Sequence, residues 1–108
     1  MTTFDKREEA FEAKFAHDES MRFKATARRN KLLGLWAADL MGLSGADADA
    51  YAKEVIKADF EEVGEEDVFR KVRQDFDAKG VERSDHQIVK QMQELMIVAK
   101  EQIANEAE

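Results

Sequence analysis

The residues that could support catalysis or metal binding do not form a recognisable site along the chain. His17 and His86 are the two histidines, and they lie far apart without the H-E-x-x-H spacing of zinc enzymes. There is no cysteine, which excludes a thiol enzyme and cysteine-ligated zinc or iron–sulfur sites. Neither a G-x-x-x-x-G-K-[ST] phosphate loop nor a G-x-G-x-x-G fingerprint occurs. We therefore predict that the chain is not an enzyme and has no catalytic residues, cofactor or metal.

One cluster of carboxylates, between residues 61 and 67, has enough charge to attract a divalent cation weakly. It lacks the order of ligands and the central glycine of an EF-hand, so a solvated junction between helices is the favoured interpretation. Paired carboxylates elsewhere fall on faces expected to be exposed. Nothing there would raise a carboxyl pKa for acid–base catalysis.

Charge is distributed unevenly along the 108 residues, whose net charge is −7. Residues 1–19 carry −3, residues 20–31 carry +5 and residues 32–108 carry −9. The acidic body argues against a nucleic-acid partner, which it would repel. The basic stretch is a candidate docking patch for an acidic partner; the alternative is a solvated helix face whose charges pair with the body. Its five residues are Arg22, Lys24, Arg28, Arg29 and Lys31.

The N-terminal segment has an apolar stripe at helical spacing, formed by Phe4, Phe11 and Phe15. Burying a phenylalanine is worth about 1.5–3 kcal/mol. Ordering the backbone costs about 1–2 kcal/mol per residue, so the segment alone should be a frayed helix at best. Such a segment is ready to fold in a partner's groove, unless its phenylalanines simply extend the chain's own core. We predict a mobile, partly helical arm over residues 1–19.

The rest of the chain, residues 20–108, is expected to form a compact all-α four-helix bundle. Proline is absent, and 38% of the residues are charged, which favours helices. Ser44 is a predicted N-cap, Gly64 a predicted C-cap, and Ser84 with Gln87 a capping box. Helices are predicted over about 21–41, 46–63, 65–79 and 85–105. Their expected buried residues are Leu32, Leu33, Trp36, Ala37, Leu40, Ala48, Tyr51, Ala52, Val55, Ile56, Val63, Val68, Phe69, Val72, Phe76, Ile88, Met92, Leu95, Met96, Ala99 and Ile103.

No apolar run approaches the roughly 20 residues needed to span a bilayer, and the first residues contain no apolar stretch typical of a secretory signal. We therefore expect a cytoplasmic protein that does not insert into the membrane. We also expect the protein to be monomeric when free.

Several stretches resemble one family. Phe4–Glu19 (FDKREEAFEAKFAHDE) is similar to the opening of the zeta subunit, the ATPase inhibitor of alphaproteobacterial F-type ATP synthases. The segment ARRNKLLGLWAA, at residues 27–38, resembles the most distinctive stretch of that family, and AYAKEV at 50–55 and DVFRK at 67–71 continue the resemblance. It covers essentially the whole chain and is strongest up to about residue 73.

The resemblance implies a four-helix bundle preceded by a mobile inhibitory arm. The arm would enter the catalytic interface between the alpha and beta subunits of the synthase head, with gamma as a further candidate contact. There it would fold as a helix and block rotation in the ATP-hydrolysing direction. Phe4, Phe11 and Phe15 would be its anchors, and charged side chains would orient it: Arg7, Glu8, Glu12 and Lys14.

The protein would then associate peripherally with the membrane-bound synthase. The alternative is a small helical adaptor protein that docks an acidic partner through residues 22–31.

Overall fold

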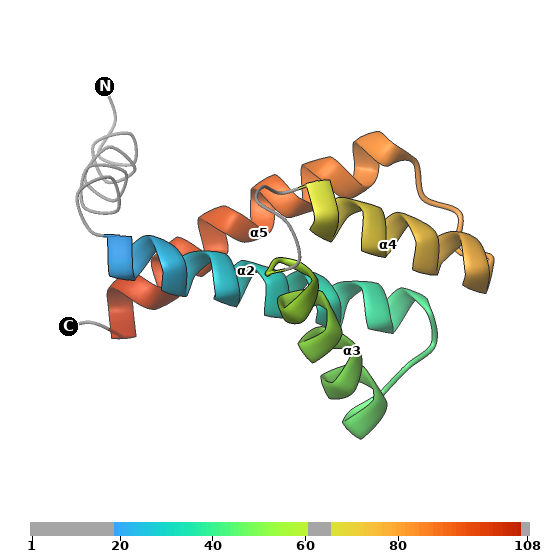
Figure 1. Cartoon of the computed structure of the whole chain (residues 1–108), viewed down its shortest axis with the longest axis horizontal. Coiled ribbons are helices and arrows are strands. Elements are labelled where there is room, and N and C mark those ends of the chain that lie inside the picture. Colours follow the sequence, from blue (N-terminus) through green and yellow to red (C-terminus); the bar gives the residue numbers. More distant parts are fainter. Residues whose placement is uncertain (1–18, 61–65, 107–108) are drawn as a thin grey trace.

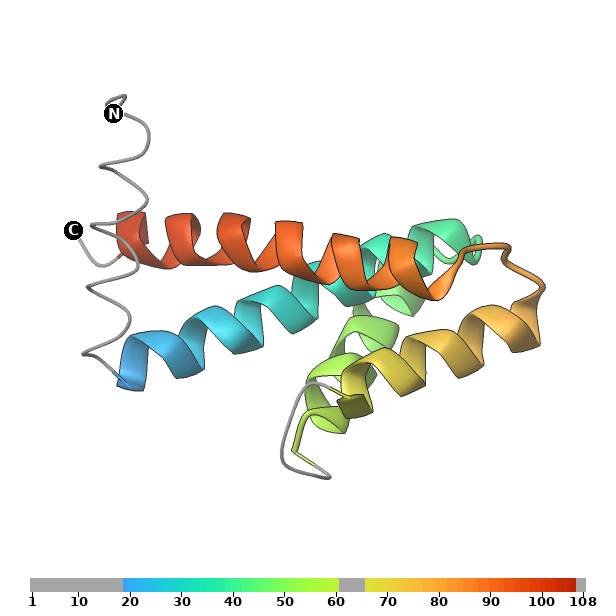
Figure 2. The same ribbon diagram turned by 90° about the horizontal axis from the view of Figure 1, so that it is seen from above.

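The computed structural model describes residues 19–60 and 66–106, which form four α-helices. They are α2 (Glu19–Leu40), α3 (Gly45–Ala58), α4 (Glu66–Lys79) and α5 (Asp85–Glu106). The two long helices, α2 and α5, run side by side (Figures 1 and 2). The α3 helix packs along α2, so that Phe60, just after α3, meets Phe23 of α2, whereas α4 lies toward the end of α2 that is remote from Glu19. The prediction of an all-α, compact four-helix fold is confirmed.

The main hydrophobic core lies where the second half of α2 meets the other three helices. Leu33 and Ala37 of α2 are fully buried there, and Trp36 packs on Phe76 with ring centroids 5.6 Å apart. A smaller core joins the start of α2 to the end of α5. Its buried residues are Met21, Ala25, Ile103 and Ala104.

Most predicted buried faces are confirmed. Fully or nearly fully buried are Leu33, Ala37, Tyr51, Ala52, Val55, Val68, Val72, Phe76, Ile88, Met92, Ala99 and Ile103. The others that the structure describes are only partly buried, at the margins of the core: Leu32, Trp36, Leu40, Ala48, Ile56, Phe69, Leu95 and Met96.

The predicted turn between α2 and α3 is present. Gly42 has a φ of 79°, and the Leu43 amide donates to the Ala38 carbonyl at 2.8 Å, which closes the end of α2. Ser44 occupies the N-cap position of α3, but its side chain makes no capping hydrogen bond. The carbonyl of Ser44 instead accepts the amides of Asp47 and Ala48, at 3.2 and 3.4 Å. The predicted N-cap position of Ser44 is therefore confirmed, but the side-chain hydrogen bond of a cap is not formed.

The predicted end of the second helix is wrong. We expected it to run to about Val63, whereas α3 ends at Ala58 and a turn follows, in which the Phe60 amide donates to the Lys57 carbonyl. Ala58 is the last buried residue of α3, and a helix is stabilised mainly by packing its apolar face. Val63 and the predicted C-cap Gly64 lie outside the described residues.

The capping box before α5 is confirmed in both directions. The Gln87 amide donates to Ser84 Oγ at 3.1 Å, and the Ser84 amide donates to Gln87 Oε1 at 2.8 Å. The bounds of α4 and α5 agree with the predicted ranges to within one residue.

Candidate partner-binding surfaces

The seven residues predicted to form the inhibitory arm surface lie outside the described residues, so their role stays a prediction. They are Phe4, Arg7, Glu8, Phe11, Glu12, Lys14 and Phe15. The structure describes the chain from Glu19, the first residue of α2. The start of α2 lies beside the end of α5, because Met21 belongs to the same small core as Ile103 and Ala104 (Figure 1). The predicted arm therefore joins the body at this end.

The five residues of the basic stretch do not form one exposed patch. Arg22, Lys24 and Lys31 are exposed on α2. Arg28 is partly buried and donates to Gln102 Oε1 at 2.8 Å and to both carboxylate oxygens of Glu106, at 2.8 and 3.0 Å. This contact joins α2 to the acidic end of α5, as expected if the basic residues pair with the body. The docking role of the stretch stays untested.

Arg29 is placed where the sequence interpretation did not expect it, in the interior with 1% of its surface exposed. Its Nε donates to the Oδ1 of Asn30, which is also buried, at 2.7 Å. The residue type suggested an exposed position, but the spacing indicates burial. Arg29 lies four residues before Leu33 and four after Ala25, on the buried stripe of α2. Continuing that stripe backwards through the basic stretch would have found it.

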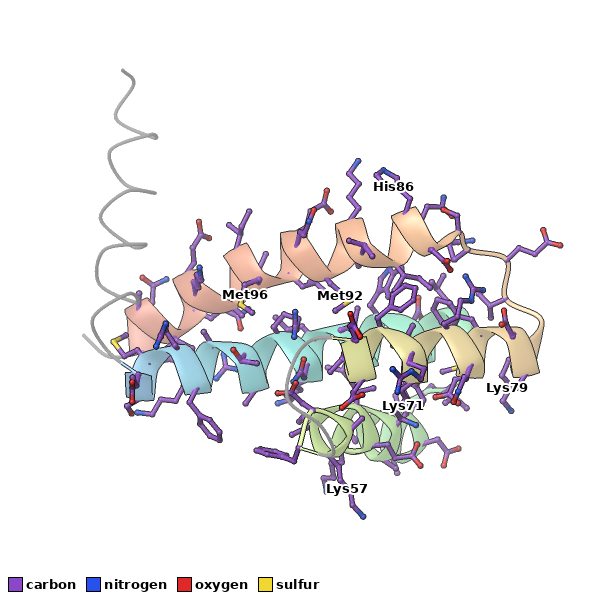
Figure 3. The ribbon with its side chains drawn as sticks, turned by 45° about the horizontal axis from the view of Figure 1, so that its top comes forward. Lys57, Lys71, Lys79, His86, Met92 and Met96 are labelled. Atoms are coloured by element: carbon purple, nitrogen blue, oxygen red, sulfur yellow. The ribbon has the colours of Figure 1, made fainter. Side chains whose placement is uncertain are left out.

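A polar groove of about 440 Å³ separates α3 from α4, and charged side chains of both signs line it, including Glu54, Lys57 and Arg70. Lys71 extends from α4 toward α3 (Figure 3) and pairs with Asp75 at 3.1 Å and Glu54 at 3.9 Å. The opposite charges in this groove therefore form ion pairs, as expected for a structural contact between two helices.

Tyr51 anchors the same junction from α3. Its hydroxyl donates to Asp75 Oδ2 at 2.7 Å, and Lys71 Nζ lies 5.1 Å from the ring centroid. Burial, and then the hydrogen bond to Asp75, raise the pKa of Tyr51 above its usual range. The phenol therefore stays neutral and acts as a hydrogen-bond donor, which suits a structural contact better than acid–base catalysis.

A second polar contact fixes the connection between α4 and α5. Arg73 donates to Asp77 Oδ1 at 2.8 Å, to Asp85 Oδ1 at 3.1 Å and to the Arg83 carbonyl at 2.6 Å. The hydrogen bonds to the two carboxylates raise the pKa of the Arg73 guanidinium. Arg73 therefore positions the start of α5 relative to α4.

An apolar groove of about 490 Å³ opens between α4 and α5. Met92 and Met96 point from α5 toward α2 and line the groove (Figure 3), together with Phe69 of α4. Val89 and Ile97, on the rim, are 40% and 52% exposed. The sequence predicted the two methionines on a buried face but gave no indication of the groove, because that depends on how far apart α4 and α5 lie.

An aromatic patch, formed by Phe23 of α2 and Phe60 just after α3, lies on another face of the body. The two side chains are 59% and 64% exposed, and their ring centroids are 6.1 Å apart. Beneath them is a cavity of about 20 Å³ that the buried side chain of Asn30 helps to line. Within the part of the chain that the structure describes, the Nδ2 of Asn30 has no hydrogen-bond acceptor. Sequence reasoning did not single out either phenylalanine as functional.

Over the described ranges, 19–60 and 66–106, the structure contains no group of three or more histidine, cysteine, aspartate or glutamate side chains that could hold a metal. None of the four helices is long and apolar enough to cross a membrane.

Comparison with known proteins identifies one family. The model of the family described as ATPase inhibitor subunit zeta matches residues 1–102. A protein whose solution NMR structure is known is 55% identical in sequence and superposes with a TM-score of 0.71; the match covers 80% of this chain and 98% of the other. The comparison with curated proteins gives no match.

Proposed function

The chain belongs to the ATPase inhibitor subunit zeta family, and on this basis we propose that residues 1–19 are its inhibitory element. Family membership implies a non-enzymatic regulator that binds an ATP synthase. In our proposal the arm folds as a helix at the alpha/beta catalytic interface, with gamma as a further candidate contact, and blocks rotation in the hydrolytic direction. The body, residues 20–108, stays outside as a folded, monomeric domain, and the protein associates from the cytoplasm with the membrane-bound synthase.

One observation carries this proposal: the family match begins at residue 1 and therefore includes the arm with its stripe of Phe4, Phe11 and Phe15. The arm has few other ways to gain stability, because three phenylalanines cannot offset the ordering cost of the segment. A groove in a partner supplies the missing apolar contacts. The charged residues Arg7, Glu8, Glu12 and Lys14 would then orient the helix.

The adaptor alternative has less support. It needs the basic stretch as one exposed surface, whereas Arg29 is buried and Arg28 is bound to Glu106. Only Arg22, Lys24 and Lys31 remain exposed for such docking.

Deleting residues 1–18 tests the proposal. We expect the truncated chain to lose inhibition of ATP hydrolysis by a purified alphaproteobacterial synthase that has been stripped of its own inhibitor. Its helical circular dichroism and thermal midpoint should match those of the full chain, because both described cores remain.

A full-length variant with alanine at Phe4, Phe11 and Phe15 should inhibit at least about 30-fold more weakly, since anchor residues at interfaces are each worth about 2 kcal/mol or more. The matched control replaces Thr2 and Thr3 by alanine and should inhibit normally. Full inhibition by the truncated chain would refute the proposal.

A further inference from the structure

The aromatic patch is the part of the body whose exposure is not explained by the packing of the four helices. Phe23 and Phe60 are more exposed than the rim residues of the apolar groove, yet they come from α2 and from the turn after α3, and their ring centroids are 6.1 Å apart. Neither ring belongs to either core. Two adjacent, mostly exposed aromatic side chains are typical of surfaces that another protein covers, since aromatic residues dominate interface energetics.

We propose that the aromatic patch is a second docking site for the catalytic head of the ATP synthase, beside the arm. The inference depends on the proposed function and names a further contact with the same partner. Phe23 is the fifth residue of α2, about 6 Å along the helix axis from Glu19, where the predicted arm ends. An arm held inside the head therefore brings Phe23 to the head's outer surface.

The surroundings of the patch indicate which chemistry would receive it. Arg22 and Lys24 flank Phe23 in the chain, and both are exposed. Lys57 lies one turn before Phe60 and is exposed as well. Asp59, next to Phe60, lines the small cavity beneath the two rings, so charges of both signs lie around the patch. The complementary surface is thus an apolar pocket with a polar rim. Aromatic anchors with a polar rim are a common composition for interface hot spots.

A second contact would also strengthen binding by the arm. Once the arm is bound, the patch meets the head at a high effective concentration, and the two contacts reinforce each other. The body would then contribute to affinity instead of only carrying the arm. The apolar groove between α4 and α5 has no such connection to the arm, and nothing in its surroundings identifies an occupant.

Phe60 gives the sharpest test, because it lies on the body and is remote in sequence from the arm. We expect full-length Phe60→Ala to inhibit the purified synthase about tenfold more weakly, with an unchanged thermal midpoint. Phe23→Ala should behave similarly, and the double variant should lose less than the product of the two effects, because the rings share one contact. The matched control is Ile97→Ala, which removes an apolar side chain of similar exposure from α5 and should inhibit normally.

A cross-linking experiment keeps the proposal testable even if an alanine variant folds poorly. Phe60→benzoylphenylalanine should cross-link to the alpha or beta subunit on irradiation, and Ile97→benzoylphenylalanine should not. Cross-linking at position 60 only to a second copy of this chain, or to nothing, would overturn the inference. Normal inhibition by Phe60→Ala, together with loss of inhibition on deleting residues 1–18, would overturn the aromatic patch and leave the inhibitory arm intact. Failure of that deletion would refute the proposed function itself.

Discussion

The contact between α2 and α3 and the space between α4 and α5 show two different ways of joining helices. At the first, Gly34 and Ala52 bring the backbones so close that a Cβ atom on Gly34 would lie 2.6 Å from Ala52 Cα. At the second, the helices diverge, and long side chains such as Met92 and Met96 line the apolar groove instead of filling it. Small residues give a close and rigid contact, whereas flexible methionines tolerate an open one.

The close contact and the aromatic patch both lie between α2 and the part of the chain formed by α3 and the turn after it. Phe23 and Phe60 belong to the same pair of segments that Gly34 and Ala52 lock together. A docking surface is more effective when its parts are held in place before binding. The open groove lies mainly between α4 and α5, although Arg29 of α2 also lines it.

The largest effect on stability should come from filling the close contact. Gly34→Ala should lower the free energy of unfolding by about 1–3 kcal/mol, because the added methyl overlaps backbone that cannot move away alone. This expected loss of stability is the net effect, after the gain of about 1 kcal/mol that alanine brings in helix propensity. Chemical denaturation measures the difference. Ala52→Gly should not rescue it, because the clash is with the Cα atom. A stabilised Gly34→Ala would show that the helices are not closely packed.

An intermediate effect should come from the polar contact that holds α4 against α3. Tyr51→Phe should cost about 1–2 kcal/mol, since it leaves Asp75 without its phenol donor. The pKa of Tyr51 is raised in the folded state, so the unfolded chain loses this proton first. The contribution is therefore fully present below about pH 10 and is lost as the pH rises above it.

The measurement is convenient because Tyr51 is the only tyrosine. Phenolate absorbance of the native protein should appear only well above the pH at which it appears in denaturant. The loss of stability above about pH 10 should be smaller in Tyr51→Phe. Equal titration of native and unfolded protein would show that the phenol is solvated.

The smallest effect should come from the rim of the apolar groove. Ile97→Ala should change the free energy of unfolding by no more than about 0.5–1 kcal/mol, because the side chain is 52% exposed and its removal leaves no closed cavity. If Ile97→Ala lowered the free energy of unfolding nearly as much as Gly34→Ala, side chains would have to fill the groove in solution. The α4–α5 contact would then be packed as closely as the α2–α3 contact.

The fold could be predicted from sequence where the information is local. The capping box of Ser84 and Gln87 and the spacing of Val68, Val72 and Phe76 were enough to locate α4 and α5. The end of α3 could not be predicted, because the apolar pattern continues beyond Ala58 whereas the next apolar residue, Phe60, is exposed. Tertiary contacts decide where such a helix stops.

The candidate surfaces were less predictable. Charge alone suggested an exposed role for Arg29, whereas its position on the Ala25–Leu33 stripe places it inside. The pairing of Phe23 with Phe60 depends on the crossing of two segments, which no spacing along the chain encodes. The arm was predicted from composition and resemblance, and its role rests on experiments with the synthase.

The bonds from Arg28 to Gln102 and Glu106 place the beginning of α2 beside the end of α5. A fluorescent protein or affinity tag fused after residue 108 would accordingly lie next to the base of the arm and could obstruct the motor by its bulk alone. The connection around Gly80, at the opposite end of the molecule, is the safer place for a label (Figure 1). Inhibition assays on C-terminally tagged protein should therefore be repeated after the tag has been cleaved.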